Sequence, residues 1–381
     1  MNSLLCLVTL MIYSLVLIEM GEGCMGVVSH KNKNNGMDTN LSRYHDVVKH
    51  RYVNTKVKCL LDTFVEWNYC PTNKHYNHDR DKDKQKQLFA RRGPRIFEKF
   101  DWVIWDTFED KSFLDNNRPP DTVLIRNDFF HRRFYGRYGH LQIFANLSIL
   151  SGSEKRILVV AGDDDHLTSF ATKRSHINYL RARFSDMFHS AKNMRSDDFK
   201  TVPLGLFNPY LLAVGYEQVE KAYGVATSLP PAQRERLILG AWGSKHAGLD
   251  KRIEARKTLQ HYLADRDVVF QREHLTPAAY WKALPQYKYS FCPTGNGIQS
   301  PKLYESWLLR VVPVTLREPA FDDLQSYGFP LVIVDSWYEV NTTLLEALYA
   351  DTYRHTNWTR VEYLMSTEGV FQFIQDGVYR I

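Results

Sequence analysis

The stretch YKYSFCPTGNGIQSPKLYESWLLRVVPVT (residues 287–315) contains an apolar run, a glycine turn, an amphipathic segment and a second apolar run. Ser300 is a good N-cap residue, and Pro301 suits the first position of a helix, so the glycine turn is expected to lead into a helix at Pro301. A strand, a helix and a second strand in this order make a βαβ unit of a parallel sheet. The stretch therefore predicts an α/β fold.

Short apolar runs and helical patterns alternate over both halves of the chain. Strands are expected at 102–105, 123–125, 141–144 and 157–160, and again at 237–242, 268–270, 289–292, 311–315 and 331–335. Helices are expected over 166–190, 251–264, 277–284 and 301–310. The Pro-containing polar segment GVATSLPPAQRER (224–236) separates the two series. This organisation predicts βαβ units and parallel sheets in two domains joined by a linker.

Composition excludes several classes of protein. A chain of 381 residues exceeds the size of one hydrophobic core, and its 44% hydrophobic and 24% charged residues argue against disorder. The net charge of +6 is mild and spread along the chain, so no nucleic-acid partner is expected. No C-x-x-C pair occurs, which argues against a structural zinc site. Cys59 and Cys70 are close enough in sequence to form a disulfide in an oxidising compartment.

The N-terminus carries an uncharged apolar run, SLLCLVTLMIYSLVLI (Ser3–Ile18). Such a run is a signal-peptide core or a short membrane anchor. N-x-S/T sequons support exposure to the secretory lumen, and they begin at Asn40, Asn146, Asn341 and Asn357. We therefore expect a single-pass type II protein of the Golgi or endoplasmic reticulum membrane with a lumenal body, or a secreted protein if the segment is cleaved.

The glycine turn and the helix after it carry the residue types that bind a sugar nucleotide. Gly295, Asn296 and Gly297 let a ligand approach the backbone, and a helix N-terminus offers free N–H groups and a positive dipole end to a diphosphate. Lys302 and Glu305 are three residues apart and share one helix face, where the cation suits a phosphate and the carboxylate suits ribose hydroxyls. The alternative is an ordinary solvated ion pair on a helix surface.

This stretch resembles the donor domain of exostosin-type (family 47) glycosyltransferases and, more loosely, that of α1,3-fucosyltransferases. The matching residues are Gly295, Asn296, Gly297, Lys302, Glu305 and Pro313–Val314. Further matching pieces are ILVVAGDDDH (157–166), SAKN (190–193), VPLGL (202–206) and FPLVIVDSWYEV (329–340). The resemblance covers about residues 155–350. It departs from the family at Lys302, where an Arg is usual, and in a loop with fewer basic residues.

The resemblance implies the GT-B architecture, in which two Rossmann-like domains have a cleft between them. It also implies a transfer of sugar from a nucleotide sugar, with a UDP-sugar favoured, to a glycan or glycoprotein acceptor. No metal or other cofactor is required. The implied organisation is an anchor or signal over 1–25, a stem and charged loop region over 26–95, an acceptor domain over 96–223 and a donor domain over 237–381. The donor-binding residues would be Lys245, Arg252, Gly295, Asn296, Gly297, Ser300, Lys302 and Glu305.

An inverting transfer also needs a base in the N-terminal half, and Asp163, Asp165 and His166 are the candidates. Two alternatives stay open. The D-x-D pattern of Asp163–Asp165 is also that of metal-dependent glycosyltransferases, in which the acids hold Mg²⁺ or Mn²⁺ against the diphosphate. The second alternative is that the chain is a non-catalytic glycan-binding protein with a degenerate donor site.

Overall fold

The computed structural model of the chain describes residues 96, 99–104, 120–126, 155–161, 166–170, 174–206, 211, 214–230, 233–241, 259, 270–271, 275–295 and 297–378. The unit Met1–Asp62 contains none of these residues, and every element below belongs to the unit Thr63–Ile381. The expected anchor at Ser3–Ile18, the stem, and Cys59 and Cys70 lie outside the described residues. Among the helices of the described ranges, none has the length and apolarity needed to cross a membrane.

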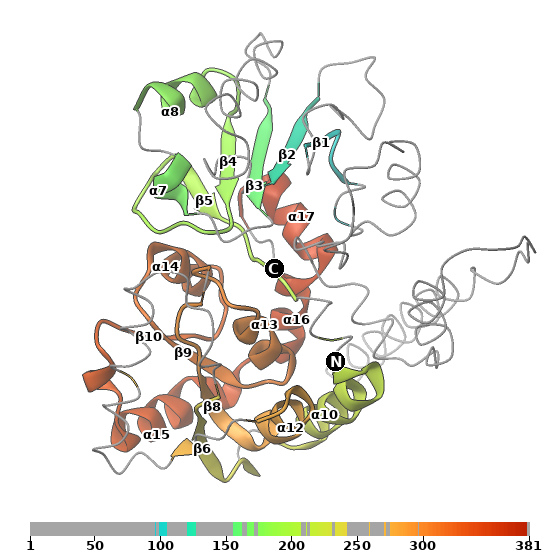
Figure 1. Cartoon of the computed structure of the whole chain (residues 1–381), viewed down its shortest axis with the longest axis vertical. Coiled ribbons are helices and arrows are strands. Elements are labelled where there is room, and N and C mark those ends of the chain that lie inside the picture. Colours follow the sequence, from blue (N-terminus) through green and yellow to red (C-terminus); the bar gives the residue numbers. More distant parts are fainter. Residues whose placement is uncertain are drawn as a thin grey trace, which may run out of the picture. The chain divides into compact units, whose positions relative to one another are not determined.

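The first sheet has five parallel strands whose order across the sheet is their order along the chain (Figure 1). Its strands are β1 (Trp102–Ile104), β2 (Thr122–Arg126), β3 (Ile157–Ala161), β4 (Asp186–His189) and β5 (Phe199–Thr201). The strands expected at 102–105, 123–125 and 157–160 are confirmed, and the one expected at 141–144 lies outside the described residues.

The helix expected over 166–190 is wrong in its last part. The segment contains α7 (Leu167–Phe170) and α8 (Arg174–Arg181), but residues 186–189 form β4, which pairs with β3. Met187 and Phe188 of β4 pack into the cores on opposite faces of the sheet, which is the two-residue period of a strand.

Both faces of the first sheet are covered by apolar packing. One face joins β2 and β3 to α7 and α8, through Val123, Ile125, Leu158, Val160, Leu167 and Leu180. The other face joins the same two strands to α17 (Thr367–Asp376), through Leu124, Ile157, Val159, Val370, Phe373 and Ile374. The last described helix therefore completes the core of the first sheet, although it follows the second sheet in the chain. The proposed domain boundaries stay a prediction, and any boundary has to accommodate this packing.

The second sheet also has five parallel strands, in the order β10-β9-β8-β6-β7. Its strands are β6 (Arg236–Leu239), β7 (Phe270–Gln271), β8 (Tyr287–Phe291), β9 (Val312–Leu316) and β10 (Val332–Val334). All five had been expected from their apolar runs, so the α/β class with two parallel sheets is confirmed.

Helices flank the second sheet and connect it to the first. They are α10 (Tyr216–Ser228), α12 (Pro277–Ala283), α13 (Pro301–Leu308), α14 (Pro319–Ser326), α15 (Thr342–Asp351) and α16 (Trp358–Met365), with 3-10 turns η5 (Leu284–Gln286), η6 (Trp337–Glu339) and η7 (Tyr353–His355). The helices expected at 277–284 and 301–310 are confirmed as α12 and α13. The linker expected over 224–236 is wrong at its start, because residues 224–228 belong to α10, which packs against α12. Of the helix expected over 251–264, only Leu259 is described.

Candidate functional site

The loop after β8 lies where the strand order of the second sheet reverses. β8 and β6 are neighbours, and the chain continues from β6 to β7 on one side and from β8 to β9 on the other. Open parallel sheets bind ligands outside the carboxyl ends of their strands at such a reversal. The segments that begin at Gly240 and at Cys292 follow these two strands. Lys245 and Arg252 come after Gly240 in the chain, but both lie outside the described residues.

α13 begins where the sequence predicted, but the backbone N–H groups of its first turn are not free. Ser300 is the N-cap, and its Oγ accepts a hydrogen bond from the Lys302 N–H at 3.3 Å. Pro301 has no N–H, and the Leu303 N–H donates to the Ser300 carbonyl at 3.0 Å. The expectation of free N–H groups at the first turn of this helix is therefore wrong. The dipole and the Lys302 ammonium remain to meet an anion.

The loop before α13 is tightly closed. The Gly295 N–H donates to the Gly297 carbonyl at 3.1 Å, and Gly297 is buried. Asn296 lies between them, outside the described residues. The glycine turn expected here is thus seen at its two ends.

Glu305 is buried, with 5% of its surface exposed, so the alternative of an ordinary solvated ion pair on the helix surface is wrong for this residue. Tyr280 of α12 lies against the same face of α13, because its ring centroid is 3.8 Å from the Lys302 ammonium. Burial raises the pKa of Glu305 above its ordinary value, and Lys302 and the Tyr280 hydroxyl offset part of that rise. Lys302 and Glu305 thus belong to a packed cluster with Tyr280, which sequence reasoning missed.

A small polar layer lies beneath this cluster. The Ser306 and Ser290 hydroxyls are 2.7 Å apart, and Ser306 also donates to the Lys302 carbonyl at 2.6 Å. Cys292 is buried beside them, and burial raises the pKa of its thiol to about 11. A thiol held neutral in this way is a poor nucleophile, so the layer supports the helix rather than reacting.

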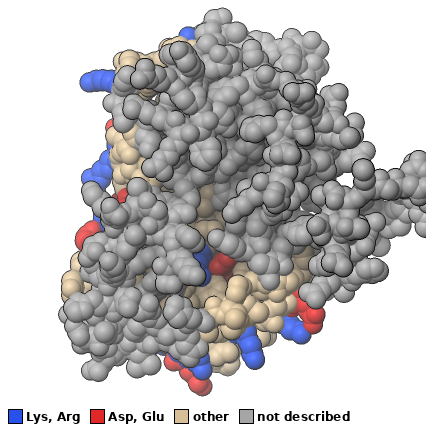
Figure 2. Space-filling view, in the orientation of Figure 1, with Lys and Arg blue, Asp and Glu red and all other residues tan. Residues whose placement is uncertain are grey.

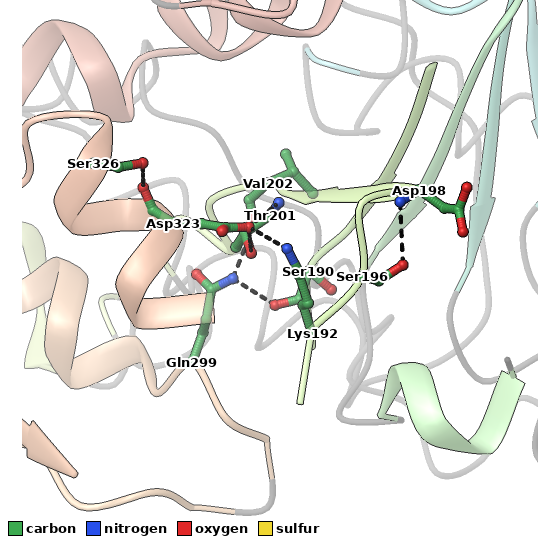
Figure 3. Close-up of polar contacts among 9 residues, drawn as sticks. All are labelled: Ser190, Lys192, Ser196, Asp198, Thr201, Val202, Gln299, Asp323 and Ser326. Carbon is green, nitrogen blue, oxygen red and sulfur yellow. Dashed lines mark hydrogen bonds and ion pairs between the residues drawn. The ribbon is translucent and has the colours of Figure 1, made fainter. Parts of the chain in front are cut away.

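Gln299 connects the glycine loop to the first sheet (Figure 3). Its Nε2 donates to the Ser190 carbonyl and, at 2.9 Å, to the Val202 carbonyl. Its Oε1 accepts from the Leu204 N–H at 3.0 Å and from the Tyr304 hydroxyl. Ser190 follows β4 and Val202 follows β5, so the carboxyl ends of these strands meet the loop that follows β8.

A second polar contact reinforces this connection. The Asp323 carboxylate of α14 accepts from the Lys192 ammonium at 2.9 Å and from the Thr201 N–H and hydroxyl at 2.9 and 2.7 Å (Figure 3). The Ala320 N–H donates to the Lys192 carbonyl at 3.1 Å. The side chain of Lys192 is buried, so this pair is largely shielded from solvent.

On the first sheet, His166 is the only one of the three candidate bases that is described. Asp163 and Asp165 lie outside the described residues. His166 Nδ1 is 3.2 Å from Asn193 Nδ2, and Asn193 also donates to the Thr168 hydroxyl at 2.8 Å. This contact positions the His166 ring after β3, at the carboxyl edge where a base is expected.

His189, at the end of β4, is a buried histidine that sequence reasoning missed. Its Nδ1 accepts from the Ala191 N–H at 3.0 Å, and its Nε2 has no hydrogen-bond partner among the described residues. Burial, with a smaller effect of His166, lowers its pKa to about 3. His189 is therefore neutral at physiological pH.

The two described sequon asparagines cap helices. Asn341 Oδ1 accepts from the Leu344 N–H at 2.8 Å at the start of α15, and Asn357 Oδ1 accepts from the Arg360 N–H at 3.2 Å at the start of α16. Both side chains are exposed, and their capping role gives a structural reason for asparagine there. Asn40 and Asn146 lie outside the described residues, and glycosylation of all four stays a prediction.

Among the described side chains, no group of three or more His, Cys, Asp or Glu is placed to hold a metal ion. The Asp163–Asp165 pattern falls outside that part of the chain. On the face shown in Figure 2, the described Lys and Arg side chains lie among Asp and Glu side chains rather than in a patch of one sign.

No family model matches the chain, and no curated protein matches it. The solved structures that it resembles include Anabaena Alr3699/HepE in complex with UDP-glucose. That match has 12% sequence identity and a TM-score of 0.34, and it covers 68% of this chain and 78% of that chain. A similarity at this level carries no assignment of function.

Proposed function

We propose that the chain is a nucleotide-sugar-dependent glycosyltransferase whose donor site lies at the glycine loop and the first turns of α13. The observation that carries the proposal is the buried carboxyl of Glu305, one helical turn from Lys302, after a glycine loop at the strand-order reversal of a parallel sheet. The cation meets the diphosphate, and the carboxylate accepts the ribose hydroxyls.

The meeting of the two sheets supports the second half of the proposal. Gln299 joins the glycine loop to the residues after β4 and β5, so the carboxyl edges of both sheets approach each other there. Asp163, Asp165 and His166 follow β3 in the chain, and one of them removes the proton of an acceptor bound at the edge of the first sheet in an inverting transfer. The leaving diphosphate is met by Lys302 and the dipole of α13, with Lys245 and Arg252 as further contacts.

The finer assignments follow the resemblance to exostosin-type domains. We favour a UDP-sugar as donor, a glycan or glycoprotein as acceptor, and no required metal. The apolar run Ser3–Ile18 and the four sequons support a lumenal protein of the Golgi or endoplasmic reticulum membrane, or a secreted one.

A thermal-shift screen of the full chain against UDP, GDP, CMP and their sugars tests the donor site, because a ligand that binds only the folded state raises the unfolding midpoint. Glu305→Gln preserves the shape but weakens the contact with the ribose, at a cost of about 1.5–3 kcal/mol or roughly one to two orders of magnitude in affinity. The parent is also expected to bind UDP more tightly than 2′-deoxy-UDP, and the variant to lose that preference.

Glu368→Gln is the matched control, since Glu368 is an exposed helix carboxylate whose ion pair among the described residues is with exposed Lys99. It is expected to leave the nucleotide shift unchanged. Equal shifts for the parent and Glu305→Gln would remove the donor-site assignment. Donor binding without hydrolysis or transfer would instead favour a glycan-binding protein with a degenerate site.

A further inference from the structure

The turn before α15 places an exposed aromatic side chain close to a sequon asparagine. Trp337 of η6 is buried, and its ring centroid lies 5.6 Å from that of Phe291 in β8. Tyr338, the next residue, is 54% exposed. Asn341 follows three residues later and begins the sequon Asn341-Thr-Thr. The turn therefore presents an aromatic side chain to solvent next to a predicted site of N-glycosylation.

Hydrogen bonds fix both the turn and the asparagine. The Ser336 hydroxyl accepts from the Tyr338 N–H at 3.3 Å, and the Glu339 carboxylate accepts from the Ser336 N–H at 2.8 Å, which makes a capping box. Asn341 Oδ1 accepts from the Leu344 N–H at 2.8 Å, and Asn341 Nδ2 donates to the Glu339 carbonyl at 3.2 Å. The amide nitrogen that a sugar would modify is thus held against the residue that follows Tyr338.

We propose that Asn341 carries an N-glycan whose first sugar packs on the exposed ring of Tyr338, and that this contact stabilises the turn before α15. The C–H face of a sugar ring is apolar and packs on the flat face of an aromatic ring. The proposal rests on the lumenal location proposed above and is independent of the donor site.

Attachment of the sugar is compatible with both hydrogen bonds of Asn341. In N-glycosylation, the amide nitrogen displaces a lipid-linked pyrophosphate from the anomeric carbon of the sugar and loses one of its two protons to solvent. The other proton remains to donate to the Glu339 carbonyl, and Oδ1 still accepts from the Leu344 N–H. The helix cap and the contact with the turn are therefore retained in the glycosylated chain.

The chain supplies its own comparison in the sequon Asn357-Trp-Thr. Asn357 is also an exposed asparagine that caps a helix, because its Oδ1 accepts from the Arg360 N–H at 3.2 Å at the start of α16. The residue three positions before Asn357 is the exposed Arg354. The position equivalent to Tyr338 thus holds an arginine, and a glycan at Asn357 is not expected to gain the same contact.

Amide hydrogen exchange on the full chain from a eukaryotic host tests the contact, because exchange reports the local opening of a segment. Thr343→Ala removes the sequon but keeps Asn341 as the cap, and Tyr338→Ala removes the ring. With Tyr338 present, Thr343→Ala is expected to speed the exchange of residues 336–344 about fivefold, which is the scale of one aromatic contact. With Tyr338→Ala, the same change should have an effect of less than about twofold, since the two groups are coupled.

Trimming the glycan enzymatically to its first sugar should leave the protection in place, because only that sugar contacts Tyr338. Loss of protection on trimming would overturn the proposal. Thr359→Ala, which removes the sequon at Asn357, is the matched control. Its effect on exchange at the start of α16 is expected to stay below about twofold.

Peptide masses show whether each asparagine carries a sugar. A sugar at Asn357 but not at Asn341 would overturn the proposal and leave the lumenal location standing, whereas no sugar at either asparagine would count against both. An occupied Asn341 with the same effect of Thr343→Ala in both backgrounds would overturn the contact with Tyr338 alone. None of these outcomes bears on nucleotide binding, which the thermal-shift screen tests separately.

Discussion

Replacement of Gln299 by leucine should destabilise the chain strongly, because this buried side chain joins the glycine loop to the first sheet. Gln299 is 2% exposed and makes hydrogen bonds with Ser190, Val202, Leu204 and Tyr304. The Leu204 N–H keeps a second acceptor in the variant, since the Tyr304 hydroxyl lies 2.7 Å away. The carbonyls of Ser190 and Val202 lose the donor that Gln299 supplies.

The magnitude follows from those two carbonyls. An unsatisfied buried backbone group costs about 1–3 kcal/mol, so Gln299→Leu should lower the free energy of unfolding by roughly 2–6 kcal/mol. That is a large share of the about 5–15 kcal/mol that stabilises a typical domain. Gln299→Glu should also destabilise, and more so as pH rises, because a carboxylate oxygen then faces the two carbonyl oxygens.

Urea unfolding followed by circular dichroism measures the effect as a lower midpoint at unchanged slope. Gln375→Leu is the control, because Gln375 is exposed on α17, and a surface change of this kind usually stays within about 0.5 kcal/mol. A loss below about 1 kcal/mol for Gln299→Leu, similar to the control, would show that the hydrogen bonds of Gln299 do not hold the loop to the first sheet.

Three further outcomes are expected. The folded-state pKa of His189 is about 3, below the ordinary 6.5, so below pH 6.5 the unfolded chain binds a proton that the folded chain excludes. The free energy of unfolding should therefore fall as pH drops below 6.5, by about 2 kcal/mol at pH 5. His189→Asn should flatten this pH dependence in urea unfolding measured between pH 5 and 8. Glycosyl transfer should survive EDTA, whereas complete loss rescued by Mn²⁺ would favour a metal site at Asp163–Asp165. Treatment of the protein from a eukaryotic host with an N-glycosidase should increase its gel mobility, and no change would argue against a lumenal location.

The sequence predicts best the elements whose local signals agree with one another. Ser300 and Pro301 mark the start of α13, and the burial of β2 and β3 on both faces of the sheet follows from short continuous runs of branched apolar residues. β4 was missed because it is only four residues long and follows a helix closely. Its strand character comes from pairing with β3, a long-range contact that no local pattern contains.

The shared helix face of Lys302 and Glu305 was predicted, but the environment of these side chains was not. The three-residue spacing of Lys302 and Glu305 shows that they share a helix face, but the same spacing is compatible with solvent on that face. Burial of Glu305 depends on α12, and no signal in residues 287–315 links Tyr280 to it. In the same way, Gln299 donates hydrogen bonds to the carbonyls of Ser190 and Val202, which lie more than ninety residues earlier in the chain. Nothing in the local sequence around this glutamine indicates that contact.

The burial of Glu305 argues against a role for this carboxyl in stabilising the fold and favours a role in binding. Desolvation raises the pKa of this carboxyl even with the Lys302 ammonium nearby, so the neighbouring charge does not repay the whole cost of burying the ionised form. As pH rises above the ordinary value of 4.5, the unfolded chain releases this proton before the folded chain does, and stability falls until the raised folded-state pKa is passed. A glutamine of the same shape would avoid that loss. A ligand whose hydroxyls donate to the carboxylate would stabilise the ionised form at the same place, so binding of such a ligand should lower the pKa of Glu305.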